Sequence, residues 1–149
     1  MFGPHALRWI VLAAACLVAA DRWRAHGVAA ERADRVAAIE QRLRTARLRA
    51  ADELAQLYLE DFGPDERVSA LSRTVQAAMR GQELLTQRDP VSARALLEPF
   101  AREATAPPVI LLLFGRACQQ LGDVKSAESA LARFHQLMPQ GVETIDAGS

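Results

Sequence analysis

Histidine and cysteine, the side chains that carry much of acid–base, nucleophilic and metal chemistry, are few in this 149-residue sequence and widely separated. His5 and His26 flank an apolar run, and His135 follows Glu128 by two helical turns, which places both on one face of a helix. A single imidazole and carboxylate on an exposed helix are typical of a solvated surface. The sequence has no Cys-x-x-Cys, His-x-x-x-His or glycine-rich phosphate loop. It therefore predicts a protein that is not an enzyme and that holds no metal and no cofactor.

Charge and the two cysteines narrow the possible functions further. The sequence contains 18 basic and 18 acidic residues, so its formal net charge is zero at neutral pH. Recognition of a nucleic-acid backbone needs a positive surface, and we therefore expect no nucleic-acid partner. Cys16 lies in an apolar N-terminal run and Cys118 in a helix predicted far along the chain, so we expect no disulfide between them. Cys118 is interpreted as a small buried hydrophobic residue.

The candidate membrane segment is the apolar run WIVLAAACLVAA at residues 9–20. It is shorter than the roughly 20 residues that a spanning helix needs, and it ends in small residues, as a secretory signal peptide does. A helix that continues on both sides would place Trp9 and Trp23 about 21 Å apart, at the two interfaces of a bilayer, with Arg8 reaching the headgroups. We predict a single-pass anchor over residues 1–24, and a removed signal peptide is the alternative.

Two opposing arguments bear on the orientation of this anchor. More basic residues follow the run than precede it, which places the following domain in the cytoplasm. These residues are Arg22, Arg24, Arg32 and Arg35 after the run, and Arg8 before it. A signal-like start instead exports the chain that follows. We predict a bacterial inner-membrane protein whose soluble domain faces the periplasm, and a cytoplasmic domain is the alternative.

Residues 28–59 contain no proline or glycine and are rich in alanine, arginine, glutamate and leucine, so their summed propensity favours helix. We predict one long amphipathic helix within residues 25–62 that packs on the domain that follows. The alternative is that its first half forms a stalk or self-associates through residues 28–59. A Gly-Pro-Asp sequence ends this helix, and the next is predicted from Glu66 to Thr86. The predicted apolar stripe consists of Val36, Ile39, Leu43, Ala46, Ala50, Leu54 and Leu57.

The C-terminal half contains an internal repeat. Residues 74–107 align with residues 108–141 at a shift of about 34 residues. Each stretch reads as two short amphipathic helices, and the second stretch has a Gly-Asp turn between them and a closing proline. Two of the aligned residues, Asp89 and Asp123, are expected to cap helix N-termini. The identical pairs are Val75 and Val109, Gly81 and Gly115, Asp89 and Asp123, Ser92 and Ser126, Ala93 and Ala127, Leu97 and Leu131, and Phe100 and Phe134.

The second stretch resembles a tetratricopeptide repeat. Gly115 and Ala127 match the small positions of that family, Gly122 its turn glycine, Phe134 its bulky apolar position and Pro139 its closing proline. The resemblance implies a short solenoid of antiparallel helix pairs over residues 63–141, with repeats at residues 74–107 and 108–141. Because two repeats alone are too few for stability, we expect the helix of residues 28–59 and the start of the next helix to cover the stack. It also implies that the protein binds other proteins.

The first stretch departs from this pattern at three positions. Arg88 stands where the turn glycine is expected, and Thr105 stands where the closing proline is expected. Pro99 falls inside the second helix, which we expect to end or kink near residues 96–98. Residues 142–149 show no periodicity and are predicted to form a flexible tail.

In the family that the sequence resembles, the first helix of each repeat lines a binding groove. We interpret the corresponding surface as a site for a helix or extended segment of a partner, with Leu112 as apolar contact and Arg116 as contact for an acidic group. The alternative is that Val75, Val109 and Leu112 pack on neighbouring helices. The groove positions are Val75, Ala78, Gln82, Leu85 and Thr86 in the first stretch and Val109, Leu112, Arg116, Gln119 and Gln120 in the second.

The sequence thus predicts an all-α protein with a membrane anchor, a long linking helix and a short solenoid. Its predicted function is that of a membrane-tethered scaffold that binds partner proteins to assemble or stabilise a membrane-associated complex. One alternative is an accessory subunit of a larger membrane enzyme or transporter, held mainly by its transmembrane helix through Ala13, Ala14 and Ala15. A second alternative is a secreted periplasmic binding protein whose mature chain starts at Asp21.

Overall fold

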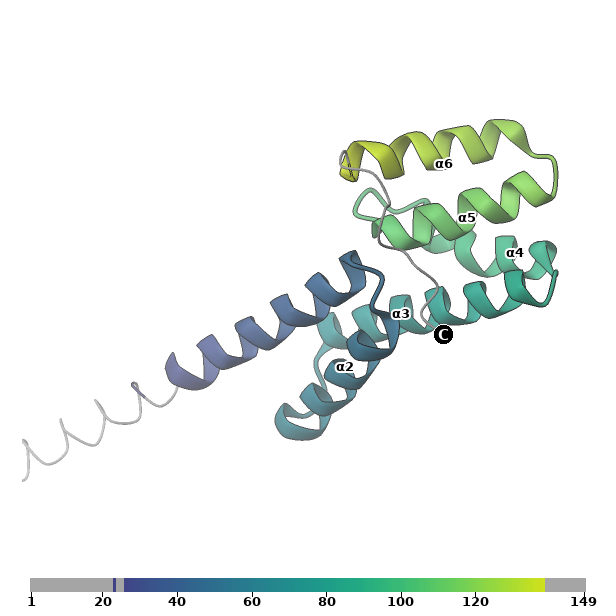
Figure 1. The fold of residues 1–149 in the computed structure, drawn as a ribbon. Helices are drawn as coiled ribbons and strands as arrows, with labels where there is room; N and C mark the ends of the chain where they lie inside the picture. The colour runs from purple at the N-terminus through teal and green to yellow at the C-terminus, as the bar shows by residue number, and fades with distance from the viewer. Residues whose placement is uncertain (1–22, 24–25, 139–149) are drawn as a thin grey trace, which may run out of the picture. The chain divides into compact units, whose positions relative to one another are not determined.

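The described part of the chain is helical throughout. The computed structural model describes residue 23 and residues 26–138, and within these residues it contains helices and their connections but no strand (Figure 1). A first helix covers residues 26–44. The all-α prediction is therefore confirmed, and α3 has the predicted bounds. The helices that follow are α2 (Leu48–Phe62), α3 (Glu66–Thr86), α4 (Pro90–Ala101), α5 (Pro108–Gln120) and α6 (Val124–Leu137).

The chain divides into two units between Arg35 and Val36. In the first unit, the described residues 26–35 are helical, and all of them except Arg35 are exposed. The Arg35 guanidinium pairs with the Glu31 carboxylate one turn earlier, with an N–O distance of 2.8 Å. The second unit, from Val36 onward, contains the buried core of the described chain.

The prediction of one continuous helix within residues 25–62 is wrong, because the chain reverses at residues 45–47. Ala46 has a φ of 56°, in the left-handed region. The Arg47 N–H donates to the Arg42 carbonyl at 2.9 Å, which closes the end of the first helix. The predicted long helix is therefore two helices joined by a tight turn.

The reversal also changes which side chains are buried. Val36 and Ile39 of the predicted stripe are buried and pack in one cluster with Tyr58 of α2. Beyond the turn the stripe loses its phase, so Leu57 is 50% exposed whereas Leu48 and Tyr58 are buried. The hairpin is stabilised by burying apolar side chains from both of its helices, and its turn contains no glycine or proline. The local sequence pattern therefore does not reveal the break.

Three helix hairpins of the second unit close in the same way: residues 36–44 with α2, α3 with α4, and α5 with α6. One residue at each reversal lies in the left-handed region, with φ values of 56° at Ala46, 61° at Arg88 and 74° at Gly122. The N–H of the following residue donates to a carbonyl in the last turn of the preceding helix, at 2.9 Å in all three cases. This arrangement is the Schellman motif, in which glycine is the usual left-handed residue. Here only the third hairpin has a glycine at this position.

Aspartates cap the N-termini of three helices. Asp65, Asp89 and Asp123 accept hydrogen bonds from backbone N–H groups in the first turns of α3, α4 and α6, at 3.0, 3.1 and 3.2 Å. The predicted caps at Asp89 and Asp123 are therefore confirmed. The hydroxyl and N–H of Ser92 lower the pKa of Asp89, and the N–H and hydroxyl of Ser126 lower the pKa of Asp123, because these donors favour the ionised carboxylate.

The two helices of each C-terminal hairpin approach closely at a glycine. A Cβ atom at Gly81 would lie 2.9 Å from side-chain carbons of Leu97, and a Cβ atom at Gly115 would lie 2.9 Å from side-chain carbons of Leu131. Both glycines and both leucines are among the aligned identical residues of the sequence repeat. The two stretches therefore contain the same helix–helix contact at equivalent positions.

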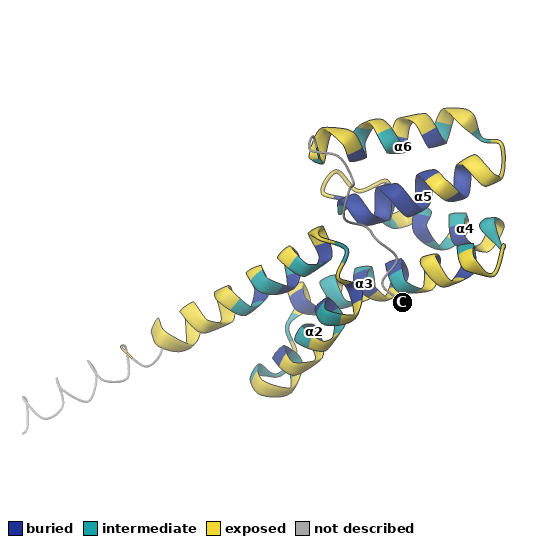
Figure 2. Ribbon diagram, viewed as in Figure 1, coloured by how far each residue is buried: buried dark blue, intermediate teal, exposed yellow. Residues whose placement is uncertain are grey.

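Helix α5 lies in the core of the second unit. Every residue from Pro108 to Gly115 is buried, as are Ala117 and Cys118, and α5 is mostly dark blue in Figure 2. It contacts α3, α4 and α6. Desolvation in this core raises the pKa of the Cys118 thiol and so favours its protonated form. The interpretation of Cys118 as a small buried hydrophobic residue is confirmed.

Helix α4 does not end at residues 96–98, because it continues through Pro99 to Ala101. Two carbonyls at its C-terminal end accept hydrogen bonds from the Arg133 guanidinium of α6. The distances are 2.6 Å from Nη1 to the Ala101 oxygen and 2.7 Å from Nη2 to the Glu103 oxygen. A cation that donates to the last carbonyls of a helix satisfies groups that have no partner within the helix. Arg133 therefore connects the second hairpin to the third.

Candidate partner-binding surface

The ten residues predicted to line a groove divide into a buried group and an exposed group. Val75, Ala78, Val109 and Leu112 are buried in the main core cluster, and Leu112 is only 8% exposed. Leu85 is partly buried against the same cluster. These apolar residues pack on neighbouring helices, as the alternative interpretation predicts. Leu112 is therefore not available as an apolar contact for a partner in this structure.

The remaining predicted residues are polar and exposed, and we call them the polar strip: Gln82 and Thr86 of α3 with Arg116, Gln119 and Gln120 of α5. α3 contacts α5, and Gln82 and Thr86 align with Arg116 and Gln120 in the repeat, so they hold equivalent positions on the two helices. The Thr86 hydroxyl donates to the Gln82 carbonyl of its own helix at 3.0 Å. The structure thus places the polar members of the predicted groove on two adjacent helices.

The polar strip offers amides and one guanidinium to the solvent. Within the described part of the chain, the Arg116 side chain has no hydrogen-bond or ion-pair partner. A glutamine amide provides two donors and one acceptor, and a guanidinium provides a planar set of donors that suits a carboxylate. This chemistry fits the peptide groups and an acidic side chain of a protein partner.

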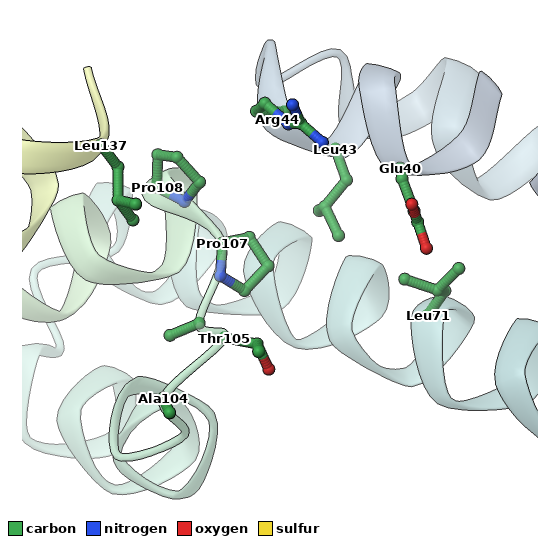
Figure 3. Close-up of a pocket in the computed structure, with 10 residues that line it drawn as sticks. Glu40, Leu43, Arg44, Leu71, Ala104, Thr105, Pro107, Pro108 and Leu137 are labelled. Carbon is green, nitrogen blue, oxygen red and sulfur yellow. The ribbon is translucent and has the colours of Figure 1, made fainter. Parts of the chain in front are cut away.

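A cleft of about 490 Å³ lies elsewhere in the second unit, between the first helix, α3, the α4–α5 connection and the end of α6. Glu40 and Leu43 project from the first helix toward Leu71 of α3, and Pro107 and Pro108 lie across from them (Figure 3). We call this space the hairpin cleft, and its lining residues are Glu40, Leu43, Arg44, Leu71, Ala104, Thr105, Ala106, Pro107, Pro108 and Leu137.

Of the two charged residues that line the hairpin cleft, one has a partner of opposite charge and the other has none among the described residues. The Glu40 carboxylate accepts a hydrogen bond from the Arg67 guanidinium at 2.6 Å, so its negative charge is compensated. Arg44 is exposed and has no hydrogen-bond or ion-pair partner among residues 26–138. The cleft is therefore apolar with one uncompensated positive charge, which favours an occupant that combines apolar and acidic side chains.

Sequence reasoning did not find the hairpin cleft. Its walls come from four segments that are distant in the chain, and the wall formed by Leu43 and Arg44 exists only because the first helix ends at the turn of residues 45–47. The Pro107-Pro108 pair was a usable signal, because consecutive prolines hold a connection in an extended form without backbone donors. The remaining walls depend on tertiary packing.

The candidate acid–base residues lie on the surface. Glu128 and His135 of α6 are exposed, and the His135 ring packs edge-on against Phe134 with a centroid distance of 5.4 Å. Among the described residues, no group of three or more histidine, cysteine, aspartate or glutamate side chains is placed to hold a metal ion.

The predicted membrane anchor lies outside the described residues, apart from Trp23. Trp9, Ala13, Ala14 and Ala15 belong to the segment that the structure does not describe, and Trp23 is 83% exposed. No helix of the described chain is long and apolar enough to cross a bilayer.

Comparison with protein-family models, with curated proteins and with solved structures finds no match for this chain.

Proposed function

We propose that this protein is a non-enzymatic scaffold of the tetratricopeptide-repeat type, tethered to a membrane by residues 1–24, that binds partner proteins and so assembles or stabilises a membrane-associated complex. The observation that carries the proposal is the repeated contact of Gly81 with Leu97 and of Gly115 with Leu131. Both contacts join the two helices of one hairpin at the same place. A fold built from repeated hairpins buries its core between neighbours and presents an extended surface for binding.

The first hairpin supports the same proposal because it supplies a third unit. About three repeats are needed before such a stack is stable, since each unit buries its apolar face only on a neighbour. Leu43 and Leu48, on either side of the first turn, join the core cluster that contains Val75 of α3 and Val109 of α5. The hairpin therefore covers the apolar side of the first aligned repeat.

The polar strip is the part of this surface best suited to a partner. Its exposed amides and the unpaired Arg116 guanidinium fit an extended or helical segment that carries an acidic side chain. A small interface of this kind gives weak binding by itself. A membrane tether raises the effective concentration for a partner in the same membrane, so that a weak contact suffices.

The test is co-purification after gentle detergent extraction of the full-length protein. The substitutions Arg116→Glu and Gln120→Ala reverse the charge and remove an amide in the polar strip, and we expect them to remove the co-purifying partner. Lys125→Glu with Gln136→Ala is the matched control, because both residues are exposed and belong to α6, which contributes no residue to the strip. The control should keep the partner. Circular dichroism should show both variants to be folded, since none of the four side chains is buried.

Retention of the partner by a folded Arg116→Glu/Gln120→Ala variant would contradict the proposal for the strip. If substitution of Ala13, Ala14 and Ala15 by larger residues then released the partner, the accessory-subunit alternative would be favoured, because small residues allow close helix packing in lipid.

A further inference from the structure

We propose that the hairpin cleft is a binding site for the chain's own segment of residues 139–149, which would occupy the cleft as an internal ligand until a competing segment displaces it. This inference does not depend on the proposed function, because it concerns a different surface from the polar strip. It is based on the dimensions of the cleft, its uncompensated charge, and the composition and starting point of the segment.

The cleft has the size and the character of a peptide site. Its volume of about 490 Å³ falls within the range of roughly 300–1,000 Å³ that is usual for ligand pockets. Its walls are formed mainly by apolar side chains, among them Leu43, Leu71, Pro107 and Pro108. A wall of prolines and leucines can accept aliphatic side chains without leaving a buried polar group unpaired.

The charge of the cleft selects an acidic occupant. Glu40 is already paired with Arg67 at 2.6 Å, whereas Arg44 has no partner within the described chain. A carboxylate placed against Arg44 would form a charge-assisted hydrogen bond, which is stronger than a neutral one. The favoured ligand therefore carries aliphatic side chains next to one or more carboxylates.

Residues 139–149, PQGVETIDAGS, have this composition. Val142 and Ile145 are the aliphatic residues, and Glu143 and Asp146 directly follow them. The segment contains no lysine or arginine, so nothing in it opposes the positive charge of Arg44.

The segment also starts at the cleft. Leu137, the last residue of α6, lines the cleft, and residues 139–149 follow it in the chain after Met138. An extended chain advances about 3.3–3.6 Å per residue, so Val142 can lie up to about 14 Å and Asp146 up to about 28 Å from Met138 without any change in the helices. A ligand attached this closely has an effective concentration on the order of millimolar, so even a weak contact would keep the cleft occupied.

Hydrogen exchange of the full-length protein tests whether the segment is bound. We expect the backbone amides of residues 142–146 to exchange at least tenfold more slowly than in the free peptide PQGVETIDAGS. Arg44→Glu and the double variant Val142→Ser/Ile145→Ser should each remove this protection. The controls Arg49→Glu, which is exposed on α2 outside the cleft, and Thr144→Ser should leave it unchanged.

Competition with the same peptide tests whether the segment occupies the cleft. A labelled PQGVETIDAGS peptide should bind the full-length Val142→Ser/Ile145→Ser variant at least tenfold more tightly than the unmodified protein, whose own segment competes. Adding Arg44→Glu to the double variant should weaken this binding.

Unprotected amides in the unmodified protein, protection that survives Arg44→Glu, or equal binding of the peptide to both proteins would each overturn the inference. These results would leave the co-purification test of the polar strip unaffected. Failure of the cleft proposal can therefore be distinguished from failure of the proposed function.

Discussion

Gly81 and Gly115 are equivalent in the repeat, but their leucine neighbours differ in burial. Leu97, which faces Gly81, has no exposed surface, whereas Leu131, which faces Gly115, is only partly buried. A methyl group added at either glycine would meet the leucine at 2.9 Å, so the leucine must move. Leu131 can turn toward solvent, and Leu97 can move only by displacing other core side chains.

We therefore expect different effects on stability from the same substitution at the two glycines. Gly81→Ala should destabilise the protein by about 1–2 kcal/mol, because overpacking a core costs roughly 1–3 kcal/mol and the gain in helix propensity returns only about 0.5–1 kcal/mol. Gly115→Ala should change stability by less than about 0.5 kcal/mol, because the smaller overpacking cost and the gain in helix propensity nearly cancel at this position. Urea unfolding measures both, and equal losses would show that the burial of the leucine is not the deciding factor.

The positive-φ residues of the three hairpin turns show which turns could be predicted from the sequence and which could not. Gly122 is a usual residue for a Schellman turn, and the sequence correctly predicted a turn there. Ala46 and Arg88 adopt the same conformation, although a side chain in this region costs about 1–2 kcal/mol. Arg88 could be placed because the repeat aligned it with Gly122. Ala46 had no aligned partner, so its turn was missed.

At the scale of helices, Arg133 has a role that depends on tertiary structure. Its guanidinium donates to the Ala101 and Glu103 carbonyls of another hairpin, at 2.6 and 2.7 Å. Arg102, by comparison, pairs with Glu98 on its own helix and is largely exposed. An exposed ion pair of that kind contributes little to stability. Loss of the Arg133 guanidinium, in contrast, leaves two carbonyls at a helix end without a donor.

We expect Arg133→Gln to lower the free energy of unfolding by about 1–2 kcal/mol, because hydrogen bonds to a charged donor contribute roughly 1.5–3 kcal/mol and this site is partly solvated. Arg102→Gln should cost less than about 0.5 kcal/mol. Chemical denaturation of the two variants side by side measures the difference. If the two variants lost the same amount of stability, the link between the hairpins would not be a stabilising one.

The sequence predicted the helices better than it predicted the turn that divides the first two of them. The Gly-Pro-Asp sequence predicted the start of α3, whose bounds are as expected, and internal similarity predicted the equivalence of the two C-terminal hairpins. Helix propensity could not predict the turn at residues 45–47, because every residue there tolerates a helix and the reversal is favoured only by burial across the hairpin. The hairpin cleft was missed for the same reason. The exposed members of the predicted groove lie on two helices in contact, α3 and α5, at positions that the repeat alignment makes equivalent.

At the scale of the whole molecule, the membrane anchor and the removed signal peptide predict different N-termini. We expect intact-mass measurement of the protein isolated from its native membrane to include residues 1–20, and the protein to require detergent for extraction. We expect a retained segment to place Trp9 and Trp23 at the two interfaces of the bilayer. A measured mass that starts at Asp21, in a protein recovered without detergent, would contradict the anchor and favour a secreted binding protein.

The burial of α5 has a consequence for how the second unit unfolds. In a linear stack of repeats, the terminal pair can fray while the rest of the stack stays folded. Here α5 belongs to the terminal pair, yet it contacts α3 and α4 as well as α6, and its buried residues run from Pro108 to Cys118 with only Arg116 exposed. Opening the C-terminal pair would therefore expose the centre of the core. We therefore expect the unit to lose its C-terminal hairpin and its core in one cooperative step, and a chain shortened before Pro108 not to fold stably.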